Sequence, residues 1–220
     1  MNSLNLEQAR HNMIEQQLRP MDIHDDNVLN AMQSVPREEY VPMEYRQLAY
    51  ADMEIPLGSG ETMLSPGIEG RLLQALDIQP DDDALVIGTG SGYLTAVISM
   101  LANRVTSIDI NSELAEEAQH RLKQHKIENV SIVVGDATRG LDDYAPYDVI
   151  AITGSMTVIP QLILENLRVG GRLFAVTGDA PAMHAQLITR KNANSWETSD
   201  LFDTELAPLE NGMQVAPFSF

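Results

Sequence analysis

The second half of the chain alternates short apolar runs with longer stretches whose apolar residues recur at helical spacing. Such runs are typical of buried strands, and the stretches between them of amphipathic helices. The predicted strands are residues 84–87, 105–108, 130–134, 149–152 and 173–176, and the predicted helices are residues 93–101, 112–125 and 160–167. Strands separated by helices form right-handed βαβ units, so the pattern predicts an α/β fold with a doubly wound, mostly parallel sheet. Two further runs, residues 187–190 and 196–202, predict an antiparallel hairpin at its edge.

The first 80 residues carry a different pattern. Apolar positions at helical spacing predict a helix over residues 6–18, and Asp25 or Asp26 caps a second over residues 27–33. An irregular stretch follows and ends at Ser65-Pro66, where a serine cap and a first-turn proline predict a third helix. Residues 1–80 are therefore expected to form a helical region beside an α/β core of residues 81–220, in one compact unit.

Composition and charge argue against several classes of protein. The chain has 220 residues, which suits one domain, and 14 Lys and Arg against 32 Asp and Glu give a net charge of −18. This balance argues against nucleic acids and anionic membranes as partners. The absence of cysteine excludes disulfides and thiolate metal sites, and no apolar run is long enough to span a bilayer. The N-terminus lacks the apolar core of a secretory signal, so a cytoplasmic location is expected.

The most informative segment is the run Gly-Thr-Gly-Ser-Gly at residues 88–92, between a predicted strand and a predicted helix. Glycines there allow a sharp turn and the close approach of a ligand, and the helix N-terminus behind them presents free N–H groups. Tyr93 stands where a dinucleotide fingerprint needs its third glycine, and the lysine of a P-loop is missing. The remaining pattern is common in methyltransferases that use S-adenosylmethionine (AdoMet). A tight turn that binds nothing is the alternative interpretation.

Two acidic residues lie at the ends of the next two predicted strands. Asp109 ends the second strand, where a carboxylate can accept hydrogen bonds from both hydroxyls of a ribose. Asp136 follows the third strand, where a carboxylate can accept a bond from an adenine amino group. Either residue alone is explained as a helix cap or a turn residue, but both in register with the glycine loop favour a nucleoside site. Acidic walls suit AdoMet, because it carries a sulfonium cation and no phosphate.

These segments resemble the protein-L-isoaspartate O-methyltransferase family. Residues 85–93 (LVIGTGSGY) are similar to the family's first AdoMet motif, and GDATRG at residues 135–140 with APYDVI at 145–150 is similar to its G-D-G…G…A-P-F/Y-D-x-I pattern. MIEQQLR, VPREEYVP and GSGET at residues 58–62 also match family positions. The resemblance spans roughly residues 10–180. It implies a Rossmann-like methyltransferase fold, AdoMet as cofactor, and isoaspartyl peptides or proteins as acceptors in protein repair.

The resemblance also implies roles for individual residues. The glycine loop would hold the methionine part of AdoMet, Asp109 the ribose, and Asp136 with Ala137 the adenine. The expected cofactor contacts are Gly88, Thr89, Gly90, Ser91, Gly92, Asp109, Ile110, Asp136, Ala137 and Thr153. Thr62 and Ser65, in the expected substrate loop of the N-terminal region, would hold the acceptor carboxylate. No metal is expected, since the five histidines show no ligand spacing with matching carboxylates and are interpreted as surface residues.

The sequence departs from the family at four positions. Val86 stands where the family usually has an acid, Leu64 where it has a substrate-loop serine, Ala137 where it has glycine, and Leu141 where it prefers an aromatic residue. Carboxyl methylation of an isoaspartyl residue remains the leading interpretation, and it needs no general base because the acceptor is ionised at neutral pH. A methyltransferase with another acceptor, favoured by Leu64, is one alternative. A catalytically decayed AdoMet-binding module is the other.

Overall fold

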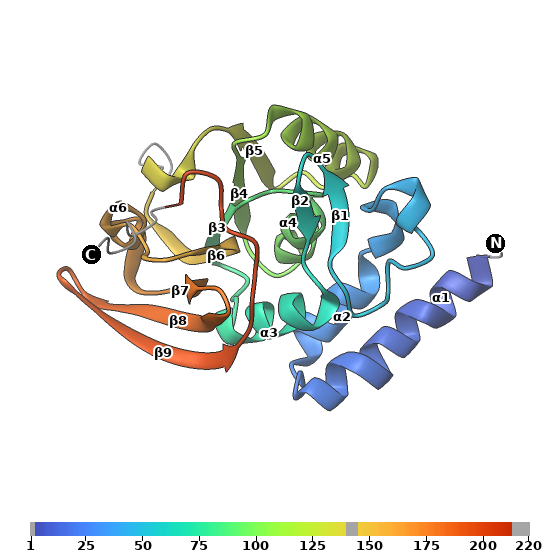
Figure 1. The fold of residues 1–220 in the computed structure, drawn as a ribbon, viewed down its shortest axis with the longest axis horizontal. Helices are drawn as coiled ribbons and strands as arrows, with labels where there is room; N and C mark the ends of the chain where they lie inside the picture. The colour runs from blue at the N-terminus through green and yellow to red at the C-terminus, as the bar shows by residue number, and fades with distance from the viewer. Residues whose placement is uncertain (1–2, 140–144, 213–220) are drawn as a thin grey trace, which may run out of the picture.

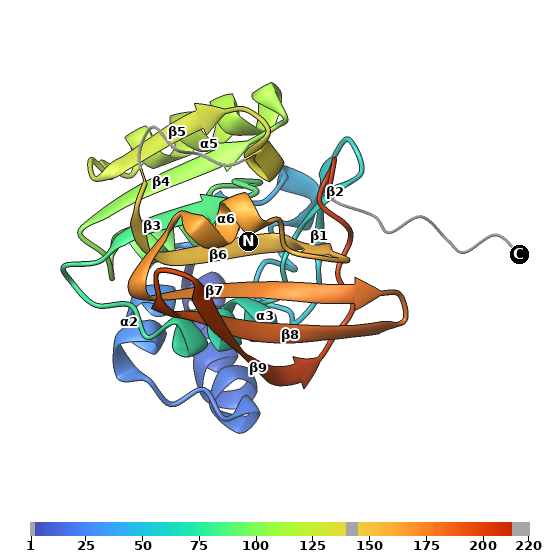
Figure 2. The same ribbon diagram turned by 90° about the vertical axis from the view of Figure 1, so that its left-hand side faces the viewer.

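The centre of the fold is a seven-stranded sheet in the order β5-β4-β3-β6-β7-β8-β9, seen face-on in Figure 2. The computed structural model describes residues 3–139 and 145–212. The strands are β3 (Asp83–Ile87), β4 (Arg104–Asp109), β5 (Val130–Val134), β6 (Tyr147–Met156), β7 (Leu167–Asp179), β8 (Ala182–Asn192) and β9 (Ser195–Asp203). Strands β3 to β7 are parallel, whereas β8 and β9 are antiparallel to their neighbours. The predicted parallel sheet and its edge hairpin are thus confirmed.

Helices cover both faces of this sheet (Figure 1). On one face α2 (Asp26–Ser34), α3 (Pro66–Leu76), α4 (Tyr93–Ser99) and α5 (Ser112–Gln124) contribute apolar side chains, and on the other α6 (Gln161–Glu165) does so. Alternate residues of β3 point to opposite faces: Val86 belongs to the first core cluster, and Leu85 and Ile87 to the second. The order of the strands reverses between β3 and β6, and in such folds the carboxyl ends at this point form a crevice.

The N-terminal region is helical, as predicted, but its first helix is not uniform. Helix α1 (Ser3–Asn12) continues as a π-helical segment η1 (Met13–Leu18) and a short 3-10 turn η2 (Arg19–Met21). The Asp25 side chain caps α2 by accepting from the backbone N–H groups of Asn27 and Val28. Two further 3-10 turns follow, η3 (Arg37–Glu39) and η4 (Met43–Tyr45). The core cluster on this face runs without a break from Met13 and Leu18 into the sheet.

The expectation of an irregular stretch before Ser65 was wrong for residues 55–63, whereas residues 46–54 form turns and bends. Residues 55–63 contain an antiparallel hairpin of β1 (Ile55–Gly58) and β2 (Glu61–Met63), whose strands are too short to produce a clear alternation. Ser65 does occupy the cap position of α3, but its side chain makes no capping bond. The Asp52 carboxylate accepts from the Gly67 N–H at 2.9 Å instead. A carboxylate beside a helix N-terminus is favourable because the helix dipole places partial positive charge there.

No helix within residues 3–139 and 145–212 has both the length and the apolar character that a bilayer crossing requires.

Candidate active site

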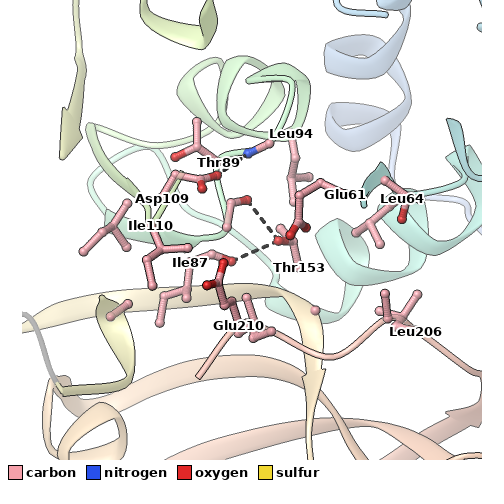
Figure 3. A pocket seen from close by; sticks show the side chains of 18 of the residues that line it. Glu61, Leu64, Ile87, Thr89, Leu94, Asp109, Ile110, Thr153, Leu206 and Glu210 are labelled. Carbon is pink, nitrogen blue, oxygen red and sulfur yellow. Dashed lines mark hydrogen bonds between the residues drawn. The ribbon is translucent and has the colours of Figure 1, made fainter. Parts of the chain in front are cut away.

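A pocket with about 970 Å³ of empty space, including open solvent at its mouth, lies at the carboxyl ends of β3, β4 and β6 (Figure 3). Its walls come from the β1–β2 hairpin and α3, the glycine loop, the segments after β4 and β5, β6, and residues 206–210 near the C-terminus. Figure 3 shows Glu61 and Leu64 on one side and Asp109 and Ile110 on the other. The pocket thus brings residues 54–64 and 206–210, which are far apart in the sequence, together around the glycine loop.

Most of the predicted site residues line this pocket. They are Thr62, Gly88, Thr89, Gly90, Ser91, Asp109, Ile110, Asp136, Ala137 and Thr153. Two are not part of the lining: Gly92, which ends the glycine loop next to Ala118 of α5, and Ser65, at the start of α3. Residues 140–144, which include the expected family positions Gly140 and Leu141, lie outside the part of the chain that the structure describes.

The glycine loop has the backbone that only glycine adopts easily. Gly88 and Gly92 have φ values of +88° and +85°. A Cβ on Gly88 would lie 2.1 Å from the Thr153 hydroxyl oxygen, which itself lies 2.9 Å from the Gly88 carbonyl oxygen. A Cβ on Gly92 would lie 2.9 Å from the Ala118 Cβ. Gly88 therefore allows the close approach of β6, and Gly92 allows the loop to pack on α5.

The hydroxyl groups of the loop are used to support it. Thr89 Oγ1 lies 2.7 Å from Ser107 Oγ, which in turn lies 2.9 Å from Thr95 Oγ1, and all three residues are buried. Ser91 Oγ accepts from the Tyr93 N–H at 3.2 Å, and the Ser91 carbonyl accepts from Arg121. These bonds hold the loop from below.

Asp109 joins the end of β4 to the glycine loop. Its Oδ2 accepts from the Gly90 N–H at 2.8 Å and its Oδ1 from the Asn111 N–H at 2.9 Å. Only 8% of the residue is exposed, and it lines the pocket. Each carboxylate oxygen has more than one acceptor position. Asp109 can therefore hold the loop and still accept a bond from a bound ligand.

Asp136 has a comparable place after β5. Its Oδ1 accepts from the N–H and the hydroxyl of Thr138, and its Oδ2 from the Asn211 side-chain amide at 3.3 Å. Beside it lie Ala137 and the apolar Ile110. This end of the pocket therefore pairs a carboxylate with apolar surface, the combination that a flat heterocycle with an amino group requires.

The opposite wall is formed by residues 61–64. Thr62 Oγ1 donates to Glu54 Oε2 at 3.1 Å, and Leu64 is 5% exposed between the pocket and the core. Glu61 faces the pocket, and burial together with repulsion from Asp109 and Glu210 raises the pKa of its carboxyl. This side of the site therefore combines one hydroxyl, the apolar side chains of Met63 and Leu64, and several acids.

Sequence reasoning missed part of the lining. Residues 206–210 carry no motif, yet they close one side of the pocket because backbone bonds hold them to β6: Ser155 N–H donates to the Ala207 carbonyl and Leu209 N–H to the Ser155 carbonyl. Glu54 and Glu69 also line it. Val86, by contrast, is fully buried in the core and is not part of the lining.

The histidines do not contribute to the site. Four are exposed, but His125 is half-buried and stacks on Tyr40 with ring centroids 5.3 Å apart, so the interpretation of all five as surface residues was wrong for His125. Its ring nitrogen lies 3.1 Å from a Glu39 carboxylate oxygen. Among the described residues there is no group of three or more His, Asp or Glu that could hold a metal ion.

Comparison with known proteins shows the family of the chain. The family model for protein-L-isoaspartate(D-aspartate) O-methyltransferases matches residues 8–214. The chain belongs to this family. It is 38% identical over 212 residues to the protein-L-isoaspartate O-methyltransferase of Koribacter versatilis, covering 96% of this chain and 94% of that one. It is 40% identical over 185 residues to protein-L-isoaspartate O-methyltransferase 1 of Syntrophobacter fumaroxidans, covering 84% and 86% of the two chains.

Solved structures of the family share the fold. One of a protein-L-isoaspartate O-methyltransferase superposes with a TM-score of 0.79 at 24% identity and covers 91% of this chain and 66% of that one. A second, a putative protein-L-isoaspartate O-methyltransferase of Plasmodium falciparum in complex with S-adenosyl-L-homocysteine, superposes with a TM-score of 0.78 at 22% identity and covers 94% and 99%. The Rossmann-like methyltransferase fold implied by the sequence motifs is therefore confirmed.

As a member of the family, the chain is an AdoMet-dependent carboxyl O-methyltransferase. Its pocket fits that cofactor. The backbone of the glycine loop, without a side chain at Gly90, and the carboxylates of Asp109 and Asp136 line it together. The acidic lining suits a sulfonium cation.

Proposed function

We propose that this chain methylates the α-carboxylate that an isoaspartyl linkage exposes in damaged peptides and proteins. The observation that carries the proposal is the single pocket shared by the glycine loop and residues 61–64. A cofactor bound on the first wall and a carboxylate bound on the second would meet within it. The relatives named protein-L-isoaspartate O-methyltransferase, which match nearly the whole chain, support the same acceptor.

The cofactor roles proposed for single residues follow their positions. Gly88, Gly90 and the loop backbone face the methionine part, Asp109 the ribose hydroxyls, and Asp136 with Ala137 the adenine. Ile110 offers apolar surface to the adenine ring. Thr153 supports the arrangement indirectly, because its hydroxyl lies within hydrogen-bond distance of the Ile87 and Gly88 carbonyl groups. When bound, AdoMet supplies a methyl group on a positively charged sulfur, an electrophile that a carboxylate attacks directly.

On the acceptor side, the carboxylate has to be positioned and desolvated, and acid–base chemistry matters less. The acceptor carboxylate is ionised at neutral pH, so no residue has to remove a proton. Holding one of its oxygens in line with the methyl group converts a bimolecular encounter into an oriented one. The candidate donors on this wall are the Thr62 hydroxyl, which would have to turn from Glu54 to the acceptor, and the backbone N–H groups of residues 61–64. Ser65 is one residue further along, outside the pocket lining.

A methyl-transfer assay tests the proposal. Purified protein is incubated with methyl-labelled AdoMet and either an isoaspartyl peptide or its aspartyl twin of the same sequence. We expect label in the isoaspartyl peptide alone, and release of that label at alkaline pH because the product is a methyl ester. Equal labelling of the twins, or none in either while S-adenosylhomocysteine binds, would contradict the isoaspartyl assignment.

One observation favours a second acceptor class. Leu64 presents an apolar side chain to the pocket where a polar contact to a carboxylate would be expected. A small acid with an apolar body would suit Leu64 better than a peptide backbone. Labelling of such acids, with the isoaspartyl peptide unlabelled, is the result that would favour this alternative.

A further inference from the structure

A buried arginine–glutamate pair lies directly behind residues 61–64, the wall proposed above to bind the methyl acceptor and called the acceptor wall below. Arg37, in η3, donates from Nη1 to Glu69 Oε2, in α3, and the two residues are 0% and 1% exposed. Arg37 Nη2 also donates to the Leu64 carbonyl at 2.5 Å. Glu69 itself lines the pocket. None of the roles proposed above uses either residue, although one guanidinium joins the acceptor wall to α3.

The same guanidinium also contacts the cofactor side. Its central carbon lies 4.7 Å from the centroid of the Tyr93 ring, and Tyr93 begins α4 immediately after the glycine loop. The turn that carries Arg37 is itself anchored to α1, because the neighbouring Glu38 accepts bonds from Arg10 and from the Tyr50 hydroxyl. The backbone of Arg37 is therefore held in place, and its side chain connects the two walls of the pocket.

Stability alone is a poor reason for such a pair. Removing two charges from water is costly, and well-packed apolar residues in place of a buried ion pair are often as stable or more so. The planar guanidinium can, however, donate in several fixed directions at once, which an apolar side chain cannot. Here those directions lead to a carboxylate of the pocket and to the backbone of the acceptor wall.

We propose that Arg37 and Glu69 are positioning residues that hold residues 61–64 in the arrangement needed to bind the methyl acceptor. Arg37 fixes the Leu64 carbonyl, Glu69 fixes the Arg37 fork, and the Tyr93 ring sets the pair against the glycine loop. The kinetic part of this inference rests on the proposed function, because it requires an acceptor peptide. The positional part does not.

The chain contains a matched control at the other end of α3. Arg172 Nε donates to the Leu76 carbonyl at 2.6 Å, and its Nη2 donates to Asp82 Oδ2 at 2.6 Å. In this pair, too, a guanidinium donates to a carboxylate and to a backbone carbonyl, but the pair is partly exposed and none of its residues lines the pocket. Asp82→Asn thus removes the same charge as Glu69→Gln, and each new amide keeps an oxygen that can accept from its arginine, without touching the acceptor wall.

The variants for the test are Glu69→Gln, Arg37→Lys and the control Asp82→Asn. A double variant, Arg37→Leu/Glu69→Leu, leaves no unpaired buried charge and provides a folded reference should a single variant lose stability. Two measurements are made with S-adenosylhomocysteine bound: hydrogen–deuterium exchange of the peptide covering residues 55–65, and the affinity for the ligand. The KM and kcat for an isoaspartyl peptide are measured separately.

We expect faster exchange in residues 55–65 for Glu69→Gln, Arg37→Lys and the double variant, with affinity for S-adenosylhomocysteine within about twofold of wild type. The acceptor KM should rise at least about tenfold, with kcat less affected. This is the effect expected when a displaced acceptor wall loses one hydrogen bond to the acceptor carboxylate. Asp82→Asn should change neither. Unchanged exchange in the folded Arg37 and Glu69 variants, or equal changes in Asp82→Asn, would overturn the inference whatever the acceptor is. A wild type that labels no isoaspartyl peptide would overturn the proposed function alone, since the exchange result stands by itself.

Discussion

The Asp109 carboxylate accepts a hydrogen bond from the backbone N–H of Gly90 at 2.8 Å, so the residue that ends β4 also sets the shape of the glycine loop. One side chain therefore has two proposed tasks, holding the loop and accepting bonds from a ribose. Both tasks require a carboxylate at the position of Asp109. A change there should affect the cofactor more than the fold.

Asp109→Ala is expected to weaken binding of both AdoMet and S-adenosylhomocysteine, since the ribose is common to the two. Hydrogen bonds to a charged group contribute about 1.5–3 kcal/mol, which corresponds to about a 10- to 150-fold rise in Kd. Titration calorimetry measures the change. Asp148→Ala is the control, because the Asp148 carboxylate accepts from the Asp83 N–H at 2.9 Å but lies outside the pocket lining. Wild-type affinity in Asp109→Ala would show that the ribose assignment is wrong.

Gly90→Ala is expected to reduce cofactor affinity at least about tenfold while the chain stays folded. Gly90 has a φ of +51° and lines the pocket, so an added methyl group strains the backbone at the cofactor wall and comes within 3.3 Å of the Leu57 side chain. Gly170→Ala separates these effects, because Gly170 has a φ of +87° with nothing near its missing Cβ and lies outside the lining. Both variants should lose about 1–2 kcal/mol of stability from the left-handed backbone. Equal loss of affinity in both would indicate that strain alone is responsible.

The sequence predicts the parts of this molecule whose physics is local. Apolar runs bounded by glycine or acidic residues become β3, β4 and β5, since a short buried strand needs little more than apolar side chains and a turn. The glycine loop is predictable for the same reason, because its backbone angles require glycine. Alignment of Asp109 and Asp136 at one edge then follows from the parallel order of the strands.

Other features depend on contacts between distant segments. The β1–β2 hairpin has strands of four and three residues, one of which contains Pro56, so no period can be read from them. Residues 206–210 reach the pocket through backbone bonds to Ser155, which any residue type can make. Glu69 is one acid in an amphipathic helix until Arg37, 32 residues earlier, is placed beside it. In each case the decisive partner is remote in sequence and leaves no local pattern.

Thr62→Val is expected to raise the KM for the methyl acceptor with little change in cofactor affinity. The Thr62 hydroxyl lies on the acceptor wall and donates to Glu54, and valine keeps its shape but offers no donor or acceptor. Steady-state methyl transfer should show about a 10-fold or larger loss in kcat/KM if the hydroxyl contacts the acceptor. Thr157→Val is the matched control, because Thr157 Oγ1 donates to Asp179 at 3.0 Å outside the pocket lining. Identical kinetics in the two variants would remove Thr62 from the acceptor site.

The stability of the chain should depend on pH through the buried Glu69. Burial raises the pKa of the Glu69 carboxyl from its ordinary 4.5 to about 7, and the nearby Arg37 guanidinium opposes part of that shift. The folded chain then holds this proton more tightly than the unfolded chain. The contribution of Glu69 to the free energy of unfolding should therefore fall as the pH rises from about 4.5 to about 7, and stay constant above that range. Urea unfolding of wild type and Glu69→Gln between pH 4 and 9 isolates this contribution, because the other titrating groups cancel in the difference. The free energy of unfolding of wild type minus that of Glu69→Gln should decline toward neutral pH and then level off. If this difference rises over the same range, Arg37 lowers the pKa of Glu69 more than burial raises it.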